Sequence, residues 1–173
     1  MSDFYSQAPA EIIGCLIYSM IEYDKGDAKR IQHFLKVHEL AAEIGRLEGL
    51  DLHMQLLVEG AAVVHDIGIH KAEEKYGSSA GHYQETEGPG EARSLLTGLG
   101  WPEEAVERIA CLVGHHHTYT DIDGADLQIL IEADFLVNIY EDKTPAQERE
   151  LVYKNIFKTG AGKKLFRLMY PET

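Results

Sequence analysis

The sequence predicts an all-α fold in a single domain. Apolar residues recur at spacings of three and four along most of the chain, which is the period of an α-helix. No segment shows convincing alternation of apolar and polar residues, which is the pattern of a strand. A chain of 173 residues is long enough for one domain with a sizeable core. We therefore expect residues 1–173 to form one helical domain with little or no sheet.

Each expected helix has its own start or stop signal. Pro9 suits a first helical turn and opens the first helix. Asp27 can cap the second helix, and Gly49 ends it. The third helix becomes apolar on most sides from Leu56 onward, so its end should be buried. Pro102 in "GLGWPEE" marks the restart after another stop. The expected ranges are 9–23, 28–48, 51–67, 86–98, 102–117, 125–141, 145–157 and 161–169.

One long polar connection is expected between the third and fourth of these helices. Residues 68–85, "GIHKAEEKYGSSAGHYQE", contain glycines and many charged side chains. Long loops in compact domains are often functional. We therefore expect this connection to lie near a functional site.

Composition and charge restrict the class of partner. The net charge of −13 disfavours non-specific binding to nucleic acid phosphates or to an anionic membrane. Any phosphate the protein handles should therefore be a small ligand at a local positive site. Cys15 and Cys111 lie in apolar helical stretches, so we expect buried free thiols and a reducing, cytoplasmic compartment. The first apolar segment has no basic residues before it and contains Glu11, so it makes a poor signal peptide. A homodimer is compatible with these features.

Polar side chains that bind metals lie in apolar parts of three expected helices. His33 lies in the second helix, His65 and Asp66 end the apolar run "AAVVHD", and Asp134 lies inside "ILIEADFLVNIY". A carboxylate inside an apolar helix almost never stays unpaired, and imidazoles with carboxylates form sites for divalent ions. Taken singly, a helix histidine is commonly structural, and Asp134 can cap a turn or pair with an arginine. Taken jointly, with "HHH" at 115–117, these residues predict a metal ion opposite His65 and Asp66.

Three stretches resemble the motifs of the HD-domain superfamily of metal-dependent phosphohydrolases: "RIQHFLKVHELAAEI", "GAAVVHDIGIH" and "LIEADFLVN". The resemblance covers residues 27–140 approximately and leaves the C-terminal helices at 145–169 outside it. It implies an orthogonal helical bundle. His33 is preferred to His38, the fallback, because "HFLKV" matches the His-x-x-x-Val spacing of the family. The four core metal ligands that the resemblance implies are His33, His65, Asp66 and Asp134.

A second metal is expected from the histidines of "CLVGHHHTY", because many members of the family hold two ions. Successive helical residues point about 100° apart, so the three histidines cannot all face one site. The family's "HH" before a turn matches His116 and His117 best, which leaves His115 as a secondary candidate.

The family's remaining histidine would fall near Gln84, where this sequence has a glutamine. His82 and Glu87 are nearby substitutes as ligands for metal or substrate. Glu87 also has an ordinary interpretation as an anion at a helix N-terminus. This departure from the family pattern predicts that the second ion binds more weakly than the first.

The resemblance implies cleavage of a small phosphoester, expected to be a nucleotide, by metal-activated water. One or two divalent ions, from among Fe, Mn, Zn, Ni, Co and Mg, would be the cofactor. Asp66, His70 and Lys71 are the candidate catalytic residues, although the last two can equally be solvated loop residues. Lys158 and Lys163, in a basic C-terminal stretch, are candidates for phosphate binding or simply exposed helix lysines.

Two other functions fit the same ligand set. An HD-type di-iron oxygenase would contain iron with a mixed-valent spectrum. A non-catalytic, metal-stabilised module would hold its metal and cleave no phosphoester.

Overall fold

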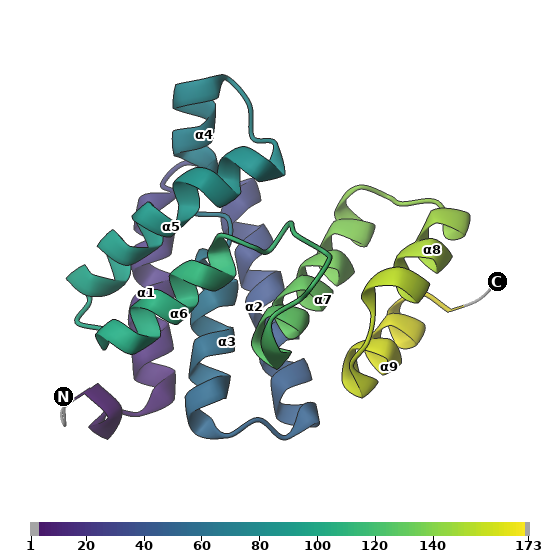
Figure 1. Ribbon diagram of the computed structural model, residues 1–173, viewed down its shortest axis with the longest axis horizontal. Helices are drawn as coiled ribbons and strands as arrows, with labels where there is room; N and C mark the ends of the chain where they lie inside the picture. The colour runs from purple at the N-terminus through teal and green to yellow at the C-terminus, as the bar shows by residue number, and fades with distance from the viewer. Residues whose placement is uncertain (1–3, 172–173) are drawn as a thin grey trace.

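Helices make up nearly all of the part of the chain that the structure describes. The computed structural model describes residues 4–171 and contains, within them, a 3-10 helix at Phe4–Ser6, nine α-helices and no strand (Figure 1). The prediction of an all-α fold is therefore confirmed. The α-helices are α1 (Pro9–Tyr23), α2 (Ala28–Glu48), α3 (Leu52–Val64), α4 (Ile69–Tyr76), α5 (Gly81–Gly98), α6 (Glu103–Val113), α7 (Gly124–Glu141), α8 (Ala146–Ile156) and α9 (Gly160–Met169).

The local signals in the sequence set several helix boundaries. The Asp27 side chain accepts a hydrogen bond from the backbone N–H of Arg30, which caps α2 as predicted. Gly49 ends α2 in the left-handed conformation, with φ of 75°. Asp51 caps α3 by accepting from the backbone N–H of Met54. Gly49 and Asp51 thus fix the two ends of the α2–α3 turn.

The predicted long connection at 68–85 is wrong, because most of it is helical. It contains α4 and the first turn of α5, and only residues 77–80 link the two helices. Ile69 and Ala72 form a small buried face on α4, and Gly77 ends that helix with φ of 64°. The abundant charged residues of this segment occupy the solvent side of a short amphipathic helix, not a loop.

Helix α3 lies at the centre of the molecule and packs against α1, α2, α6 and α7. Its close approach to α6 requires Gly60, because a Cβ there would lie 2.9 Å from Ile109 Cδ1 of α6 and 2.8 Å from the Trp101 ring just before that helix. The buried apolar side chains form one continuous cluster that runs from α1 to α9. Helices α8 and α9 form a hairpin at one side, where α9 packs against α2 and α7 (Figure 1). The end of α3 therefore points into the space between α2, α6 and α7.

The expectation of buried thiols is wrong. Cys15 and Cys111 are both exposed and free. Each lies on the solvent side of an amphipathic helix, where its apolar neighbours in sequence face the core.

Within residues 4–171, none of the helices is both long and apolar enough to cross a membrane.

Candidate metal centre

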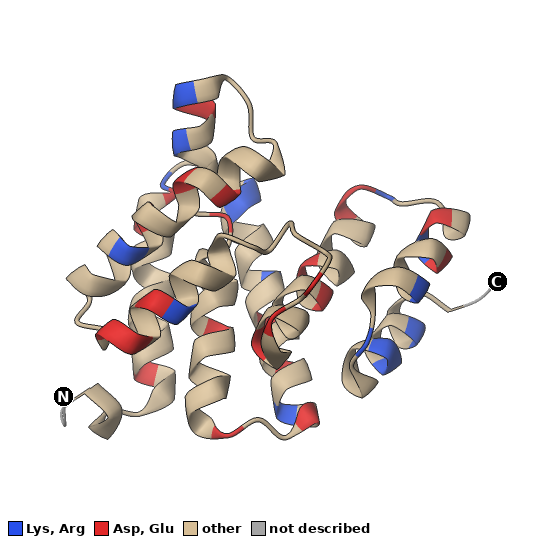
Figure 2. Ribbon diagram, viewed as in Figure 1, with Lys and Arg blue, Asp and Glu red and all other residues tan. Residues whose placement is uncertain are grey.

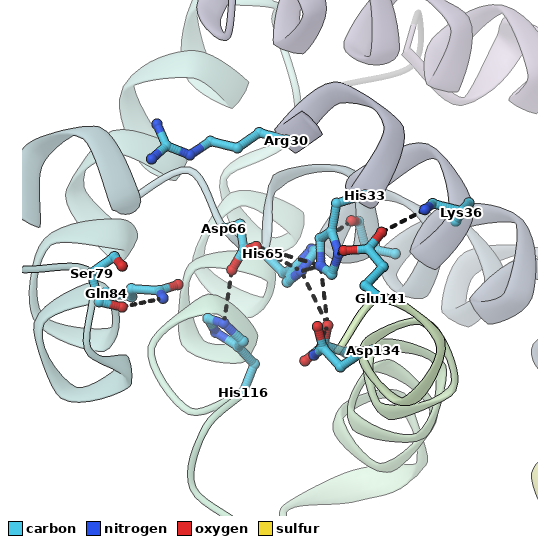
Figure 3. A network of polar contacts seen from close by, with 12 residues as sticks. Arg30, His33, Lys36, His65, Asp66, Ser79, Gln84, His116, Asp134 and Glu141 are labelled. Carbon is cyan, nitrogen blue, oxygen red and sulfur yellow. Dashed lines mark hydrogen bonds and ion pairs between the residues drawn. The ribbon is translucent and has the colours of Figure 1, made fainter. Parts of the chain in front are cut away.

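Four side chains from three helices converge beneath the surface (Figure 3). His33 comes from α2, His65 and Asp66 follow the last turn of α3, and Asp134 lies in the middle of α7. His33 Nε2 lies 3.3 Å from His65 Nε2, 3.5 Å from Asp66 Oδ2 and 3.2 Å from Asp134 Oδ1. His65 Nε2 lies 3.4 Å from Asp66 Oδ2 and 3.7 Å from Asp134 Oδ1. The packing of α2, α3 and α7 thus brings together all four residues that the sequence singles out.

These separations match the spacing of ligands around one metal ion. Nitrogen and oxygen ligands lie about 2.1 Å from a first-row divalent metal, so neighbouring ligands are about 3.0 to 3.4 Å apart. Side-chain atoms at 3.2 to 3.7 Å therefore need only small adjustments to share an ion. The donor set of two histidines and two aspartates fits such an ion.

The other ring nitrogen of each histidine is used to orient the ring. His65 Nδ1 donates to the backbone oxygen of Ala62 at 2.9 Å, and His33 Nδ1 donates to Glu141 Oε2 at 3.1 Å. Glu141 also pairs with Lys36. With the protons on Nδ1, both Nε2 atoms present lone pairs to the centre, which is how metal-binding histidines are usually held. Glu141 and Lys36 were missed by the sequence analysis, although their spacings of seven from Asp134 and three from His33 place them on the same helix faces.

A second cluster shares Asp66. Asp66 Oδ1 faces His116 Nε2 at 3.5 Å, while Oδ2 faces His33 and His65. Asp66, His116 and His117 each offer a ligand atom within 4.8 Å of the others. Among the described residues, the buried Nε2 atoms of His116 and His117 have no hydrogen-bond partner. A metal ion would satisfy both nitrogens, so these residues fit a second ion beside the first.

The turn after α6 holds His117 in place. The helix ends at Val113 instead of the expected 117, which frees the following residues to aim their side chains. The His117 backbone N–H and the Thr118 hydroxyl both donate to Glu85 Oε1 at 3.0 Å. A Cβ at Gly81 would lie 2.8 Å from the His117 ring, so only glycine fits at that position without displacing the ring.

The charges of the centre shift the pKa values of its members. Burial opposes protonation of His33, but its hydrogen bond to Asp134 and the charge of Asp66 raise its pKa to about 9. Burial lowers the pKa of His65. Burial and the neighbouring His116 lower the pKa of His117 to about 4. Protons and divalent cations therefore compete for the same histidine nitrogens and aspartate oxygens.

The clusters open into one cavity of about 350 Å³. Its wall includes His33, Asp66 and Asp134 on the metal side and two cations, Lys29 and Arg30, from the first turn of α2. Acidic residues, among them Glu73 and Asp142, complete the rim. The cavity has room for a small ligand that reaches the clustered ligand atoms.

The fold is similar to that of a solved structure. No family model matches the sequence, and no curated protein matches it significantly. A crystal structure of a predicted HD superfamily hydrolase from an uncultured Thermotogales bacterium matches with a TM-score of 0.61 and 27% sequence identity. The match covers 92% of this chain and 83% of that one. The chain has an HD-domain fold. The resemblance to the HD-domain superfamily is thereby confirmed at the level of the fold.

Several histidines lie outside the two clusters of this HD-domain fold. His38, the fallback ligand, pairs with Glu59 at 3.2 Å. His115 is exposed and donates from Nδ1 to the Cys111 backbone oxygen at 2.7 Å. His82 is exposed on α5. The structure thus brings His116 and His117, but not His115, to Asp66.

The other secondary candidates lie away from the cavity wall. Glu87 binds Lys75 and the Tyr76 hydroxyl at 2.8 and 2.6 Å. Lys71 is exposed on α4 and pairs with Glu91 at 2.6 Å. His70 binds Asp24 and Arg30 and does not itself line the cavity.

The C-terminal lysines do not form a rim around the cavity. Lys158 lies between α8 and α9, and Lys163 lies on α9; both are exposed, and neither lines the cavity. The link of Lys158 to the rest of the fold is through its backbone N–H, which donates to Glu132 at 2.6 Å. Figure 2 shows basic residues on both helices of this hairpin and on the loop that joins them.

Gln84 occupies the edge of the HD-domain centre where a family histidine was expected. It is buried and lines the cavity, and its amide nitrogen donates to the Ser79 backbone oxygen at 2.7 Å (Figure 3). Its Oε1 has no partner among the described residues. The glutamine thus places an oxygen, not an imidazole nitrogen, beside the second cluster.

Proposed function

We propose that this HD-domain protein is a metal-dependent hydrolase, and within that class a phosphohydrolase that cleaves a small phosphoester. A nucleotide is the favoured substrate. One observation carries the proposal: two ligand clusters share Asp66 at the wall of a small cavity that also contains Lys29 and Arg30. The similarity to a predicted HD superfamily hydrolase supports the hydrolase class.

His33, His65, Asp66 and Asp134 would hold the first ion, and Asp66, His116 and His117 the second. A bound divalent ion supplies Lewis acidity, which lowers the pKa of water and polarises a phosphoryl oxygen. The Asn138 amide donates to Asp134 Oδ1 at 2.9 Å and fixes that carboxylate. Glu141 orients His33 through Nδ1. The chain's own contribution is thus to hold the ligand atoms in place before a substrate arrives.

The cavity also explains how an acidic protein can take an anionic substrate. The chain carries a net charge of −13, and the rim carries more carboxylates than cations. Two divalent ions would offset the two aspartates of the centre, and the guanidinium of Arg30 adds a positive charge at the same wall. These positive charges would attract a phosphate group. Hydroxyl or amino groups elsewhere on the substrate could donate hydrogen bonds to the carboxylates of the rim.

The test is a panel of phosphomonoesters, phosphodiesters and nucleotides, assayed with protein loaded in turn with Mn²⁺, Mg²⁺, Fe²⁺, Zn²⁺, Co²⁺ and Ni²⁺. We expect phosphate release that is lost in Asp66→Asn and retained in Asp121→Asn, a matched change on an exposed loop. Iron-dependent oxidation without phosphate release would contradict the proposal and indicate an oxygenase. Full metal occupancy without any turnover would contradict it and indicate a non-catalytic module.

A further inference from the structure

Arg30 is the cation best placed to meet a substrate at this centre. It lies three residues before His33, about one helical turn away on the same side of α2, and lines the cavity with His33, Asp66 and Asp134. Figure 3 shows its side chain extending from α2 toward the side of the site where Ser79 and Gln84 lie. The guanidinium is partly exposed, at 22% of its side-chain surface.

The guanidinium is held in place but keeps free donors. One terminal nitrogen donates to His70 Nδ1 at 3.0 Å and lies 3.3 Å from Asp27 Oδ2. The other donates to Glu73 Oε1 at 2.7 Å. These contacts use at most three of the five N–H groups of an arginine. The remaining N–H groups are available to a ligand in the cavity.

His70 receives this hydrogen bond because Asp24 fixes its tautomer. A guanidinium can only donate, so His70 Nδ1 must accept, and the ring proton must lie on Nε2. That Nε2 donates to Asp24 Oδ1 at 2.9 Å, and Asp24 is only 4% exposed. The buried carboxylate, the imidazole and the guanidinium therefore form a chain from α1 through α4 to α2 that ends at the cavity.

We propose that Arg30 binds the anionic phosphoryl group of the substrate and that the Asp24–His70 pair is the positioning device that holds Arg30 for this task. The inference rests on the proposed function and deepens it. It gives His70 a different role from the catalytic one expected from the sequence: His70 acts through Arg30 and does not touch the substrate.

The experiment uses the full chain loaded with Mn²⁺, with inorganic phosphate as the probe and p-nitrophenyl phosphate as the reporter substrate. Calorimetry gives the phosphate affinity, and steady-state kinetics give KM and kcat. The variants are Arg30→Met, Arg30→Lys, His70→Gln, His70→Asn and the double variant Arg30→Met/His70→Gln. Arg93→Met, which removes an exposed arginine paired with Glu107, is the control. The Mn²⁺ content of each variant is measured in parallel.

Arg30→Met should weaken phosphate binding and raise KM by about 10- to 100-fold, the usual effect of losing charge-assisted hydrogen bonds. The phosphate affinity of Arg30→Lys should fall between those of wild type and Arg30→Met. An ammonium keeps the positive charge but cannot donate the two parallel hydrogen bonds of a guanidinium. Arg93→Met should bind phosphate with the same affinity as wild type. The Mn²⁺ content should stay unchanged in all of them.

The two His70 variants separate its two hydrogen bonds. His70→Gln keeps an amide N–H near the original Nε2 that can still donate to Asp24, but it has no acceptor at the position of Nδ1, where Arg30 donates. It should therefore raise KM with little change in kcat. His70→Asn places an acceptor near the original Nδ1 and should retain more phosphate affinity than His70→Gln. The double variant should resemble Arg30→Met, because His70 acts through Arg30.

Wild-type phosphate affinity in Arg30→Met would overturn the role of Arg30 and leave the proposed hydrolase intact if wild type turns over substrate. Additive losses in the double variant would overturn the positioning role of His70. A wild-type protein with full Mn²⁺ content that binds no phosphate would overturn both this inference and the phosphohydrolase proposal.

Discussion

Asp66 is the residue on which both clusters depend, because its two carboxylate oxygens face different histidines. Oδ2 lies 3.4 Å from His65 Nε2, and Oδ1 lies 3.5 Å from His116 Nε2. Burial would raise the pKa of this carboxyl group, but His65 and the other neighbouring histidines hold it below its usual range. Asp66 is therefore an anion available to two cations at once.

Asp66→Asn should remove the second ion entirely and reduce binding of the first, because the amide lacks the negative charge and has only one acceptor oxygen. Metal analysis after dialysis against Mn²⁺ should give less than one ion per chain, against two in wild type and in Asp121→Asn. Circular dichroism should show unchanged helical content. Retention of both ions in Asp66→Asn would refute the shared role of Asp66.

Gln84 is a position where one substitution should strengthen metal binding. Its buried side chain lines the cavity beside the second cluster. Gln84→His supplies an imidazole there and should tighten the second Mn²⁺ by about 10-fold, the lower end of the effects seen when groups around a metal are changed. A Mn²⁺ titration monitored by electron paramagnetic resonance measures the affinity for the second ion, with Gln84→Ala as the control. Equal second-ion affinities in the two variants would contradict the prediction.

At the scale of elements, Glu132 attaches the α8–α9 hairpin to α7. This fully buried carboxylate accepts the backbone N–H groups of Lys158 and Thr159 at 2.6 and 2.9 Å. It also accepts the Gln128 amide at 2.7 Å. The hairpin therefore has a polar attachment that is separate from the cavity.

Glu132→Ala leaves two backbone donors without their acceptor and should lower the free energy of unfolding by about 3 kcal/mol. Urea unfolding measures this loss. Glu39→Ala, the same change on an exposed helical surface, should change stability by less than about 0.5 kcal/mol. The number of bound Mn²⁺ ions should stay unchanged in Glu132→Ala, and a loss of metal would show that the hairpin supports the centre.

The helices that the sequence predicts well are those with a local signal at each end. Asp27 and Gly49 delimit α2 through a cap and a left-handed residue, and both signals are local. Helix α4 lacks a side-chain cap and buries only Ile69 and Ala72. Its sequence therefore has neither a start signal nor a clear apolar period, and its charged residues look like those of a loop.

His65, Asp66 and Asp134 were predictable as candidate ligands because they interrupt apolar runs, whereas His33 was selected from the family spacing in "HFLKV". Arg30 meets His70 only when the fold brings α4 to the start of α2, and no sequence period signals that contact. Glu141 shares a helix face with Asp134, but its hydrogen bond to His33 depends on the packing of α2 against α7.

At the scale of the whole molecule, the metal centre links α2, α3, α6 and α7, so an ion should stabilise the entire fold. An ion that binds only the folded state at 100 times its dissociation constant adds about 2.7 kcal/mol. For a chain of this size, 1 kcal/mol corresponds to about 2 to 4 °C in Tm.

Saturating Mn²⁺ should therefore raise the Tm of wild type by about 5 to 10 °C relative to protein treated with a chelator. Scanning calorimetry measures the shift, and Asp66→Asn should show a much smaller one. An equal shift in both proteins would place the stabilising ion elsewhere.

The metal-binding role of the centre depends on one ion held jointly by His33, His65, Asp66 and Asp134. Anomalous diffraction from crystals of the Mn²⁺-loaded protein, recorded on both sides of the manganese absorption edge, tests it most directly. We expect a strong anomalous peak about 2.0 to 2.3 Å from His33 Nε2, His65 Nε2 and a carboxylate oxygen of each aspartate. No peak between these four side chains, or a peak only at another position, would contradict it.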